Sequence, residues 1–299
     1  PTGDKVLIFN REKDGVYLYS AALADGVAQR VSNRRINTTA RKFVLWVSDT
    51  DFITACVVEG GDAPKRTHPT GPIVQESLGK KVRKRTDQGF LRDDFDQQAL
   101  KYYFTSQLVR IAPSGEREIG APAIYRTIVV SPDRSHLMVY RVVEPYSNSV
   151  KFMGLKSNVT IENVEGEVVK EVKRRGNLQW RSDKPATLVW SVKAKKDNPD
   201  CKYSIYEQDA PFDESARLLL RTQHDLDKLY WCNDNLALVV EKDKKERIIS
   251  CFKPGDMTLT KIVRYNTEDY YRTDTHWRQE RLLPVAQRLC TALAIPAPE

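Results

Sequence analysis

The chain has 299 residues, of which 40% are hydrophobic and 29% are charged, and it carries a formal net charge of +8 at pH 7. These proportions exclude an intrinsically disordered chain and leave room for one large all-β domain or two ordinary domains. No apolar run approaches the roughly 20 residues that a helix needs to cross a bilayer. The five cysteines are widely spaced and form no C-x-x-C pair, which excludes zinc-type spacing and favours buried, reduced thiols.

The N-terminal third predicts two strand–turn–strand units followed by a helix. Residues 6–9 and 16–20 flank the turn Lys13-Asp14-Gly15, and residues 43–47 and 52–58 flank the turn Asp49-Thr50-Asp51. Residues 60–72 are rich in glycine, proline and charge, which indicates a linker. Apolar side chains at helical spacing, including Phe95, Leu100 and Phe104, predict a short helix within 93–105.

From residue 106 onward the pattern is short β-rich runs separated by turn residues. The predicted strands are 106–111, 117–119, 124–130, 136–143, 159–163, 168–172, 177–180, 187–192, 202–206, 217–221, 229–231, 236–241, 247–252 and 259–265. Many short strands at regular spacing are typical of a sandwich, barrel or propeller.

One motif favours the propeller. The run S-P-D-x-x-x-L-x-V over residues 131–139 is interpreted as the turn and inner strand of one blade. Related runs of aromatic residue, polar turn and apolar strand begin at Trp46, Trp180 and Trp231. Their starts lie about 45 to 85 residues apart, which suits four-stranded blades with insertions. A single blade cannot bury both faces, so neighbouring blades must stack.

Longer stretches carry a family resemblance. The chain reads GPIVQESLGKK from Gly71, then DQQALKYYFTSQLVRI, SPDRSHLMVYRVVEPYS, LQWRSDKPATLVW and DNLALVVE. In this order the segments resemble the N-terminal β-propeller of glutamyl endopeptidases, which are serine peptidases of the prolyl-oligopeptidase clan. The resemblance implies an all-β fold, an incomplete or degenerate β-propeller of about four to five blades over residues 1–272, placed in the family before a catalytic α/β-hydrolase domain.

The final segment breaks the strand pattern. Pro284 can occupy the first turn of a helix, after which Val285, Leu289 and Leu293 fall on one face. We therefore expect a short C-terminal amphipathic helix and tail over residues 273–299, packed against its own domain or against a partner.

The sequence carries no recognised catalytic motif. A nucleophile elbow needs G-x-S-x-G between a strand and a helix, and this pattern is absent, as are the P-loop, the dinucleotide-binding glycines and H-E-x-x-H. Paired acids such as Asp93-Asp94 are expected to be turn or cap residues. The sequence therefore predicts no catalytic residue, no cofactor and no metal, although it leaves open that the chain is part of a larger serine peptidase.

The leading functional hypothesis is a non-catalytic interaction subunit of a larger assembly. Its predicted contact residues are the basic cluster Lys80, Lys81, Arg83, Lys84 and Arg85 together with Trp277, Val285, Leu289 and Leu293. The partners expected are other protein subunits, and RNA or acidic surfaces at the basic loops. One alternative is the substrate-gating propeller of a glutamyl-specific serine peptidase, and another is direct nucleic-acid binding.

The compartment is predicted from two features. The chain begins at Pro1, which is compatible with a cleaved targeting peptide or with a trimmed chain. Plant members of the resembled family are plastid proteins. Together with the unpaired cysteines, this favours an organelle, either a mitochondrion or a plastid.

Overall fold

The computed structural model describes residues 3–40, 43–67, 89–173, 176–195 and 201–266, together with Gln287, Cys290 and Thr291. The elements within these ranges are, in chain order, β1 (Lys5–Arg11), β2 (Val16–Ala22), β3 (Ala28–Arg30), β4 (Val44–Trp46), β5 (Phe52–Val57), α1 (Asp94–Phe104), β6 (Thr105–Ala112), β7 (Gly115–Val130), β8 (His136–Val142), the 3₁₀ turn η1 (Phe152–Gly154), β9 (Ser157–Asn163), β10 (Val168–Glu171), β11 (Gly176–Trp180), β12 (Thr187–Lys193), β13 (Tyr203–Asp209), β14 (Arg217–Thr222), β15 (Asp225–Asn233), β16 (Leu236–Asp243), β17 (Glu246–Phe252) and β18 (Thr260–Asn266).

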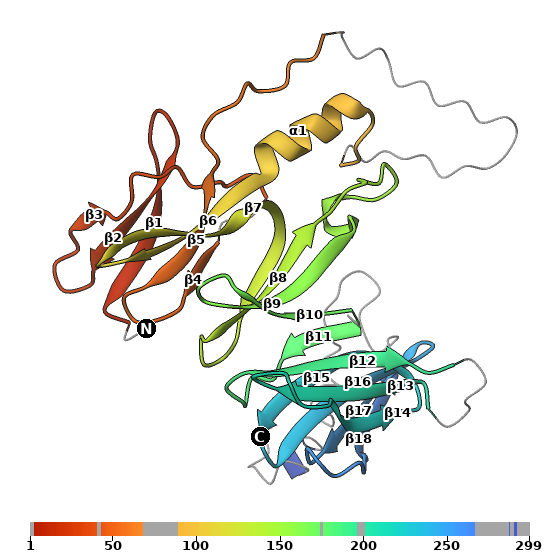
Figure 1. The fold of residues 1–299 in the computed structure, drawn as a ribbon. Helices are drawn as coiled ribbons and strands as arrows, with labels where there is room; N and C mark the ends of the chain where they lie inside the picture. The colour runs from red at the N-terminus through yellow and green to blue at the C-terminus, as the bar shows by residue number, and fades with distance from the viewer. Residues whose placement is uncertain are drawn as a thin grey trace, which may run out of the picture. The chain divides into compact units, whose positions relative to one another are not determined.

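The strands form antiparallel sheets in which sequential strands are always neighbours (Figure 1). One sheet contains β1–β3, a 7-stranded sheet contains β4–β10, and two 4-stranded sheets contain β11–β14 and β15–β18. Short strands joined by tight turns into such meanders are the blade unit of a propeller. The predicted all-β, propeller-type fold is confirmed.

The 7-stranded sheet is two blades that share one long strand. The first part of β7 pairs with β6, from Gly115 opposite Ala112 to Ile124 opposite Thr105. The second part pairs with β8, from Tyr125 opposite Arg141 to Val130 opposite Leu137. The outer strand of one blade thus continues directly into the first strand of the next. The described sheets therefore make five blades, β1–β3, β4–β7, β7–β10, β11–β14 and β15–β18.

The prediction of separate strands at 117–119 and 124–130 was wrong for this reason. Gly120 adopts a positive φ of 59°, which glycine tolerates and which lets the strand bend without ending. The pairing with β6 also shifts register between Ser106 and Leu108, as at a β-bulge. In the sequence, a glycine at such a bend resembles a turn residue, although the strand continues through it.

The blade motif lies at the turn between the first and second strands of a blade. Trp46, Trp180 and Trp231 lie at or near the end of a first strand, where each is paired with a residue at the start of the second strand. The apolar runs that follow them are β5, β12 and β16, the second strands of their sheets. The motif therefore marks the hairpin between the first and second strands, and each second strand is an inner strand with a neighbour on both sides.

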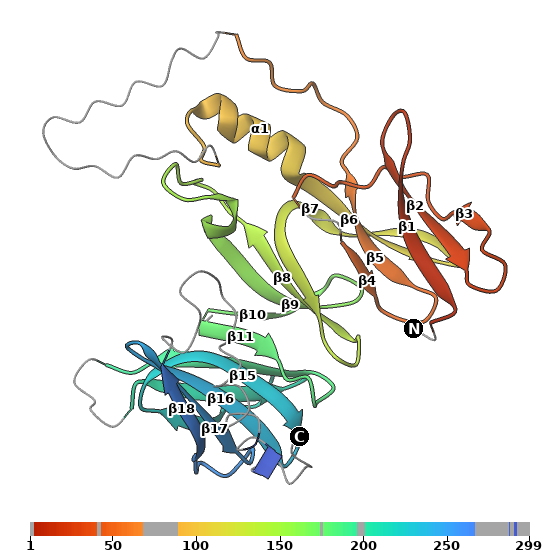
Figure 2. The same cartoon turned by 180° about the vertical axis from the view of Figure 1, so that it is seen from behind.

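The contacts between its residues divide the chain into two compact units. The first contains residues 1–130 and 134–172, and the second contains residues 131–133 and 173–299. Within the first unit, blade β1–β3 (red in Figure 2) turns one face toward β4–β6, where Leu18, Phe52 and Val109 share a buried cluster. A second buried cluster joins Ile53 and Leu108 of the β4–β7 blade to Leu137 of the β7–β10 blade. Stacked apolar faces thus hold the first unit together.

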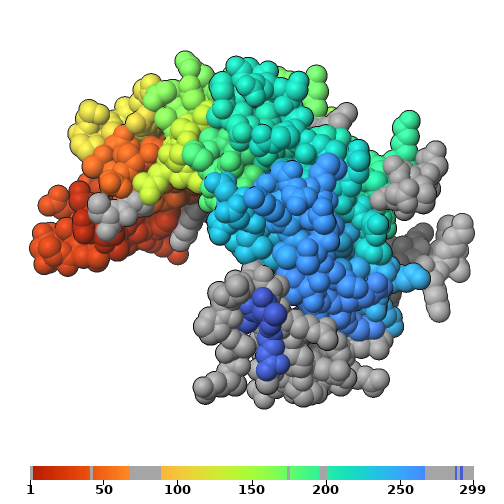
Figure 3. Space-filling model, turned by 90° about the horizontal axis from the view of Figure 1, so that it is seen from below, coloured from red at the N-terminus to blue at the C-terminus, as the bar shows by residue number. Residues whose placement is uncertain are grey.

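The second unit repeats this packing. Val189, Ile205 and Leu219 of blade β11–β14 form one buried cluster with Val239 and Phe252 of blade β15–β18. In the space-filling view the strands of the last blade, in blue, lie directly against those of the preceding blade, in cyan (Figure 3). The same physical device therefore stabilises both units.

The predicted helix is confirmed as α1. Asp93 is its N-cap, and its carboxylate accepts a hydrogen bond of 2.9 Å from the backbone N–H of Asp96. Leu100 is buried against Ile124 and Leu155, and the helix runs directly into β6 (Figure 1). Asp93 is a cap residue, as the sequence predicted.

The remaining strand predictions are confirmed within a few residues at their ends. The short edge strand β3 and the turn η1 were missed, because three residues carry too little periodicity to be recognised. Apart from Gln287, Cys290 and Thr291, residues beyond 266 lie outside the described residues, so the C-terminal helix over 273–299 and the domain boundary at 272 remain predictions. No helix among the described residues is long and apolar enough to span a membrane.

Blade stacking predicts which core truncations are costly. Replacing the fully buried Leu219 with alanine should lower the free energy of unfolding of the second unit by about 2–5 kcal/mol, because it leaves a cavity between two sheets. The adjacent, partly exposed Leu218 gives the matched control and should lose much less. Urea denaturation followed by tryptophan fluorescence measures both, and equal losses would contradict the packing.

Candidate functional site

The contact residues predicted from sequence all lie outside the described residues. These are Lys80, Lys81, Arg83, Lys84, Arg85, Trp277, Val285, Leu289 and Leu293. The structure therefore brings none of them together and separates none of them, and they remain predictions. The candidate site that can be built from described residues lies elsewhere.

Among the described residues, the most buried positively charged residue is Arg181, which follows β11 in the turn before β12. Its side chain is only 1% exposed. Its Nε donates to Asp183 Oδ1 at 3.0 Å and its Nη2 to Asp183 Oδ2 at 2.6 Å, a bidentate pair. Its Nη1 donates to Glu207 Oε2 on β13 at 2.6 Å. The guanidinium thus bridges a turn carboxylate and a strand carboxylate.

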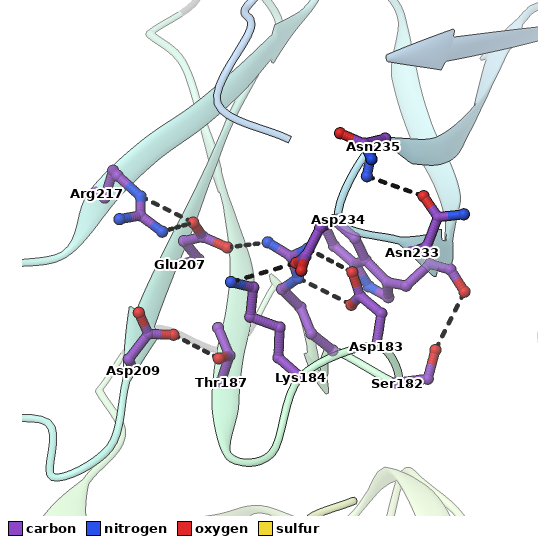
Figure 4. Close-up of polar contacts among 12 residues, drawn as sticks. Ser182, Asp183, Lys184, Thr187, Glu207, Asp209, Arg217, Asn233, Asp234 and Asn235 are labelled. Atoms are coloured by element: carbon purple, nitrogen blue, oxygen red, sulfur yellow. Dashed lines mark hydrogen bonds and ion pairs between the residues drawn. The ribbon is translucent and has the colours of Figure 1, made fainter. Parts of the chain in front are cut away.

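Further contacts extend this cluster across two blades (Figure 4). Arg217 Nε on β14 donates to Glu207 Oε1 at 2.8 Å. On the other side, the guanidinium carbon of Arg181 lies 4.4 Å from the centre of the Trp231 ring on β15, within cation–π range. The Ser182 hydroxyl donates to the Trp231 carbonyl oxygen at 3.3 Å. We call Arg181, Asp183, Glu207, Arg217 and Trp231 the Arg181 cluster.

The charges of the Arg181 cluster fix its protonation states. Burial by itself raises the pKa of the Asp183 carboxyl, but the hydrogen bonds and charge of Arg181 outweigh burial and hold that pKa below its ordinary value. Burial likewise lowers the pKa of Arg181, and the bonds to Asp183 and Glu207 raise it above its ordinary value. Both groups are therefore ionised at neutral pH.

This arrangement has little capacity for chemistry. Two arginines face two carboxylates, so the charges of the cluster balance and both carboxylates already accept arginine N–H groups. A general base must instead hold a proton-accepting oxygen toward a substrate. The cluster is best explained as a structural ion-pair network that holds the β11–β12 turn against β13 and β15.

A second buried carboxylate is also held by an arginine, in another blade. Glu162 on β9 is fully buried and accepts Arg141 Nη2 from β8 at 2.9 Å. Arg141 also donates to Thr160 at 2.9 Å and lies over the Tyr125 ring at 5.4 Å. Glu162 and Glu207 both lie on the third strand of their blades. Sequence reasoning missed both, because an isolated Glu in an apolar strand resembles a solvent-facing residue.

One serine lies beside a histidine. Ser135 Oγ is 2.7 Å from Nδ1 of the adjacent His136, in the turn that leads from β7 into β8. A hydrolase nucleophile is held on a strand-to-helix turn with an oxyanion hole formed by backbone N–H groups. Ser135 lies instead between two strands of one hairpin, so this contact is a local turn interaction.

The cysteines are all free, and their burial differs from the expectation. Cys56 and Cys201 are buried, Cys251 and Cys290 are partly buried, and Cys232 is exposed on β15. Burial raises the pKa of the Cys56 thiol to about 12, which makes that thiol unreactive at neutral pH. The expectation of a buried thiol was therefore wrong for Cys232.

The fold and its internal ion pairs define a propeller-type β-protein within the described residues. No family model matches the chain. A probable chloroplastic glutamyl endopeptidase of Oryza sativa subsp. japonica is 32% identical over 261 residues, which are 76% of this chain and 28% of that protein. A protein of the same name from Arabidopsis thaliana is 29% identical over 290 residues, 85% of this chain and 30% of that protein.

These relatives confirm the resemblance to the propeller region of glutamyl endopeptidases. The chain spans less than a third of the length of either relative. Among solved structures, the β-propeller domain of the Trilobed protease from Pyrococcus furiosus is similar at 11% identity and a TM-score of 0.44, over 88% of this chain and 68% of that one. A eukaryotic initiation factor structure is similar at 10% identity and a TM-score of 0.48, over 91% and 54%.

Breaking the Arg181 cluster should destabilise the second unit. Glu207→Ala would leave a buried guanidinium without one of its two carboxylates and should cost about 3–5 kcal/mol of unfolding free energy. The control is Asp234→Ala, which removes the exposed pair between Asp234 and Lys184 and should cost less than about 1 kcal/mol. Denaturant titration measures the free energy of unfolding of both variants. An unchanged value for Glu207→Ala would contradict a structural role of the cluster.

Acid should weaken the same cluster. Because the folded-state pKa of Asp183 lies below its unfolded value of about 3.9, its stabilising contribution is complete above that pH and is lost as pH falls through the folded pKa. The free energy of unfolding should therefore fall below about pH 4, and Asp183→Asn should flatten that fall. Thermal melts from pH 2 to pH 7 measure the slope, and an unchanged slope in the variant would count against the assignment.

Proposed function

We propose that this chain acts by binding, as a non-catalytic interaction subunit of a larger organellar protein assembly built on a peptidase-type propeller. The observation that carries the proposal is the pairing of one buried carboxylate in each unit with arginine. In both units the buried carboxylates Glu162 and Glu207 are held by arginines of their own unit. Groups held in this way stabilise blades and leave the surfaces of the blades to interact with partners.

The charge of the chain supports acidic partners. The net charge of +8 is carried in local clusters, among them Lys80–Arg85, which lie in loop-like sequence. Basic loops on a rigid β-scaffold speed association with acidic protein surfaces or RNA and orient the partner. The organelle assignment is motivated by the word chloroplastic in the names of both plant relatives.

The proposal is tested by native purification of the endogenous protein, followed by identification of the proteins that migrate with it. A variant with Lys80, Lys81, Arg83, Lys84 and Arg85 changed to glutamine should lose partners. The control carries the same change at Lys242 near the end of β16 and at Lys244 and Lys245 in the turn that follows, and it should retain the partners. A protein that purifies alone and cleaves glutamyl peptides would overturn the proposal. Ribonuclease-sensitive, steeply salt-dependent association would assign the basic cluster to RNA.

A second candidate is the substrate-gating propeller of a glutamyl-specific serine peptidase. The names of the two relatives favour it, as does the small share of their length that this chain spans. The full natural polypeptide would then hydrolyse peptides after glutamate and lose that activity to a serine-directed inhibitor. A natural polypeptide with no such activity would exclude this candidate.

A further inference from the structure

The first unit contains a pocket of about 370 Å³ beside α1. Its walls are mainly the residues that lead into α1, one face of α1 itself and the loop between β8 and β9, which lies alongside the helix in Figure 2. Ligand pockets in proteins span about 300–1,000 Å³, and a cavity of about 150 Å³ already holds one benzene molecule. The pocket is therefore large enough for a small molecule with one aromatic ring and a short chain.

The helical wall of the pocket follows from the residue spacing in α1. Asp96, Ala99, Leu100, Tyr103 and Phe104 recur at intervals of three or four residues, so they lie on one face of the helix. All of them except Asp96 are apolar or aromatic. Ala99 has the smallest side chain of this face, and it leaves space that a larger side chain would fill.

The buried part of the lining is apolar and aromatic. Leu100 and Leu155 belong to one buried cluster, on which Phe104 and Phe152 pack, and all four residues line the pocket. The ring centres of Phe104 and Phe152 lie 4.9 Å apart, with an interplanar angle of 47°. Aromatic rings favour edge-to-face and offset contacts with a further ring. This part of the pocket therefore suits a planar aromatic group.

The charged part of the lining favours an anionic ligand. Among the lining residues only Arg92 and Asp96 carry a charge. Asp96 Oδ1 accepts Arg66 Nη2 at 2.8 Å, and Asp96 Oδ2 accepts the backbone N–H and Nε of Arg92 at 2.9 and 3.1 Å. Both carboxylate oxygens are thus engaged, whereas the Nη1 and Nη2 atoms of Arg92 take no part in these bonds. A guanidinium fork of this kind matches the geometry of a carboxylate.

Arg92 and Tyr103 lie where the pocket opens to solvent. The Arg92 side chain is 52% exposed, against 16% for Asp96, and Tyr103 is 48% exposed. Tyr103 also brings a hydroxyl group to the lining, as does Thr39, and a hydroxyl can donate or accept a hydrogen bond. The pocket therefore combines a buried aromatic part with a positively charged group at its opening.

We propose that this pocket binds a small aromatic carboxylate, whose ring contacts Leu100, Phe104 and Phe152 and whose carboxylate accepts hydrogen bonds from Arg92. Burial of the ring would provide most of the affinity. The charge-assisted bonds to Arg92 would provide the preference for an acid over its neutral analogue. The inference assigns a ligand site and does not depend on the proposed assembly.

The test titrates the 299-residue chain with 3-phenylpropionate and with its neutral analogue 3-phenylpropanamide, followed by ligand-observed NMR. The acid should bind with a dissociation constant on the order of 1 mM or lower. The amide should bind about tenfold more weakly, because it lacks the charge that Arg92 recognises. Arg92→Gln should weaken binding of the acid alone and so remove the difference, whereas a general loss of structure would weaken binding of both compounds.

Two further variants of α1 locate the binding site. Ala99→Phe should fill the pocket and weaken binding of both compounds by about tenfold or more. Gln98→Phe is the matched control, because Gln98 is the preceding residue of the same helix, is exposed and does not line the pocket. This variant should bind both compounds as the unchanged chain does. Thermal melts verify that each variant is folded.

Three results would overturn the proposal. The first is an unchanged chain that binds neither compound, which would also follow if another part of the chain filled the pocket in solution. The second is equal affinity for the acid and the amide, and the third is binding that Ala99→Phe leaves intact. None of these results depends on whether the protein is recovered in an assembly, so this proposal can fail while the proposed function stands.

Discussion

The structure depends on one constraint, that a four-stranded antiparallel sheet has two faces and cannot bury both of them by itself. The β4–β7 blade solves this by presenting alternate residues of its second strand β5 to its two neighbouring blades. Phe52 on β5 packs toward the first blade, and Ile53 packs toward the third. The clusters formed in this way are closed to water, and they provide the apolar burial that stabilises each unit.

Buried ion pairs are the second structural feature. They fix the geometry of turns and strands more than they add to the free energy of unfolding. Arg181 connects the β11–β12 turn to β13 and lies over the indole of the next blade. Arg141 holds Glu162 within the β7–β10 blade. Replacing such pairs by apolar residues can be neutral, whereas removing one member is costly. They are best explained as fixing turns and strand order, which apolar contacts specify only loosely.

Much of this architecture could be predicted from the sequence, and the failures have definite physical causes. Turn residues and β-rich runs located nearly every strand, and the apolar spacing before β6 located α1. The continuous β7 was missed because a bend at Gly120 looks like a turn. The Arg181 cluster was missed because burial of Arg181 depends on Glu207 and Trp231, which lie 26 and 50 positions further along the chain and meet it only after folding. The basic residues Lys80–Arg85 remain a sequence-based prediction.

A fold shared with peptidases does not by itself assign a reaction, because function depends on sites placed on the fold. In this chain the described polar clusters stabilise blades, so the account rests on blade stacking. The most direct test is a double-mutant cycle between Ile53 and Leu137, one from each of two adjacent blades and both fully buried in one cluster. If the blades stack as described, the free energies of unfolding of Ile53→Ala, Leu137→Ala and the double variant should give a coupling of about 0.5–3 kcal/mol. Additivity to within about 0.3 kcal/mol would contradict the stacked-blade account.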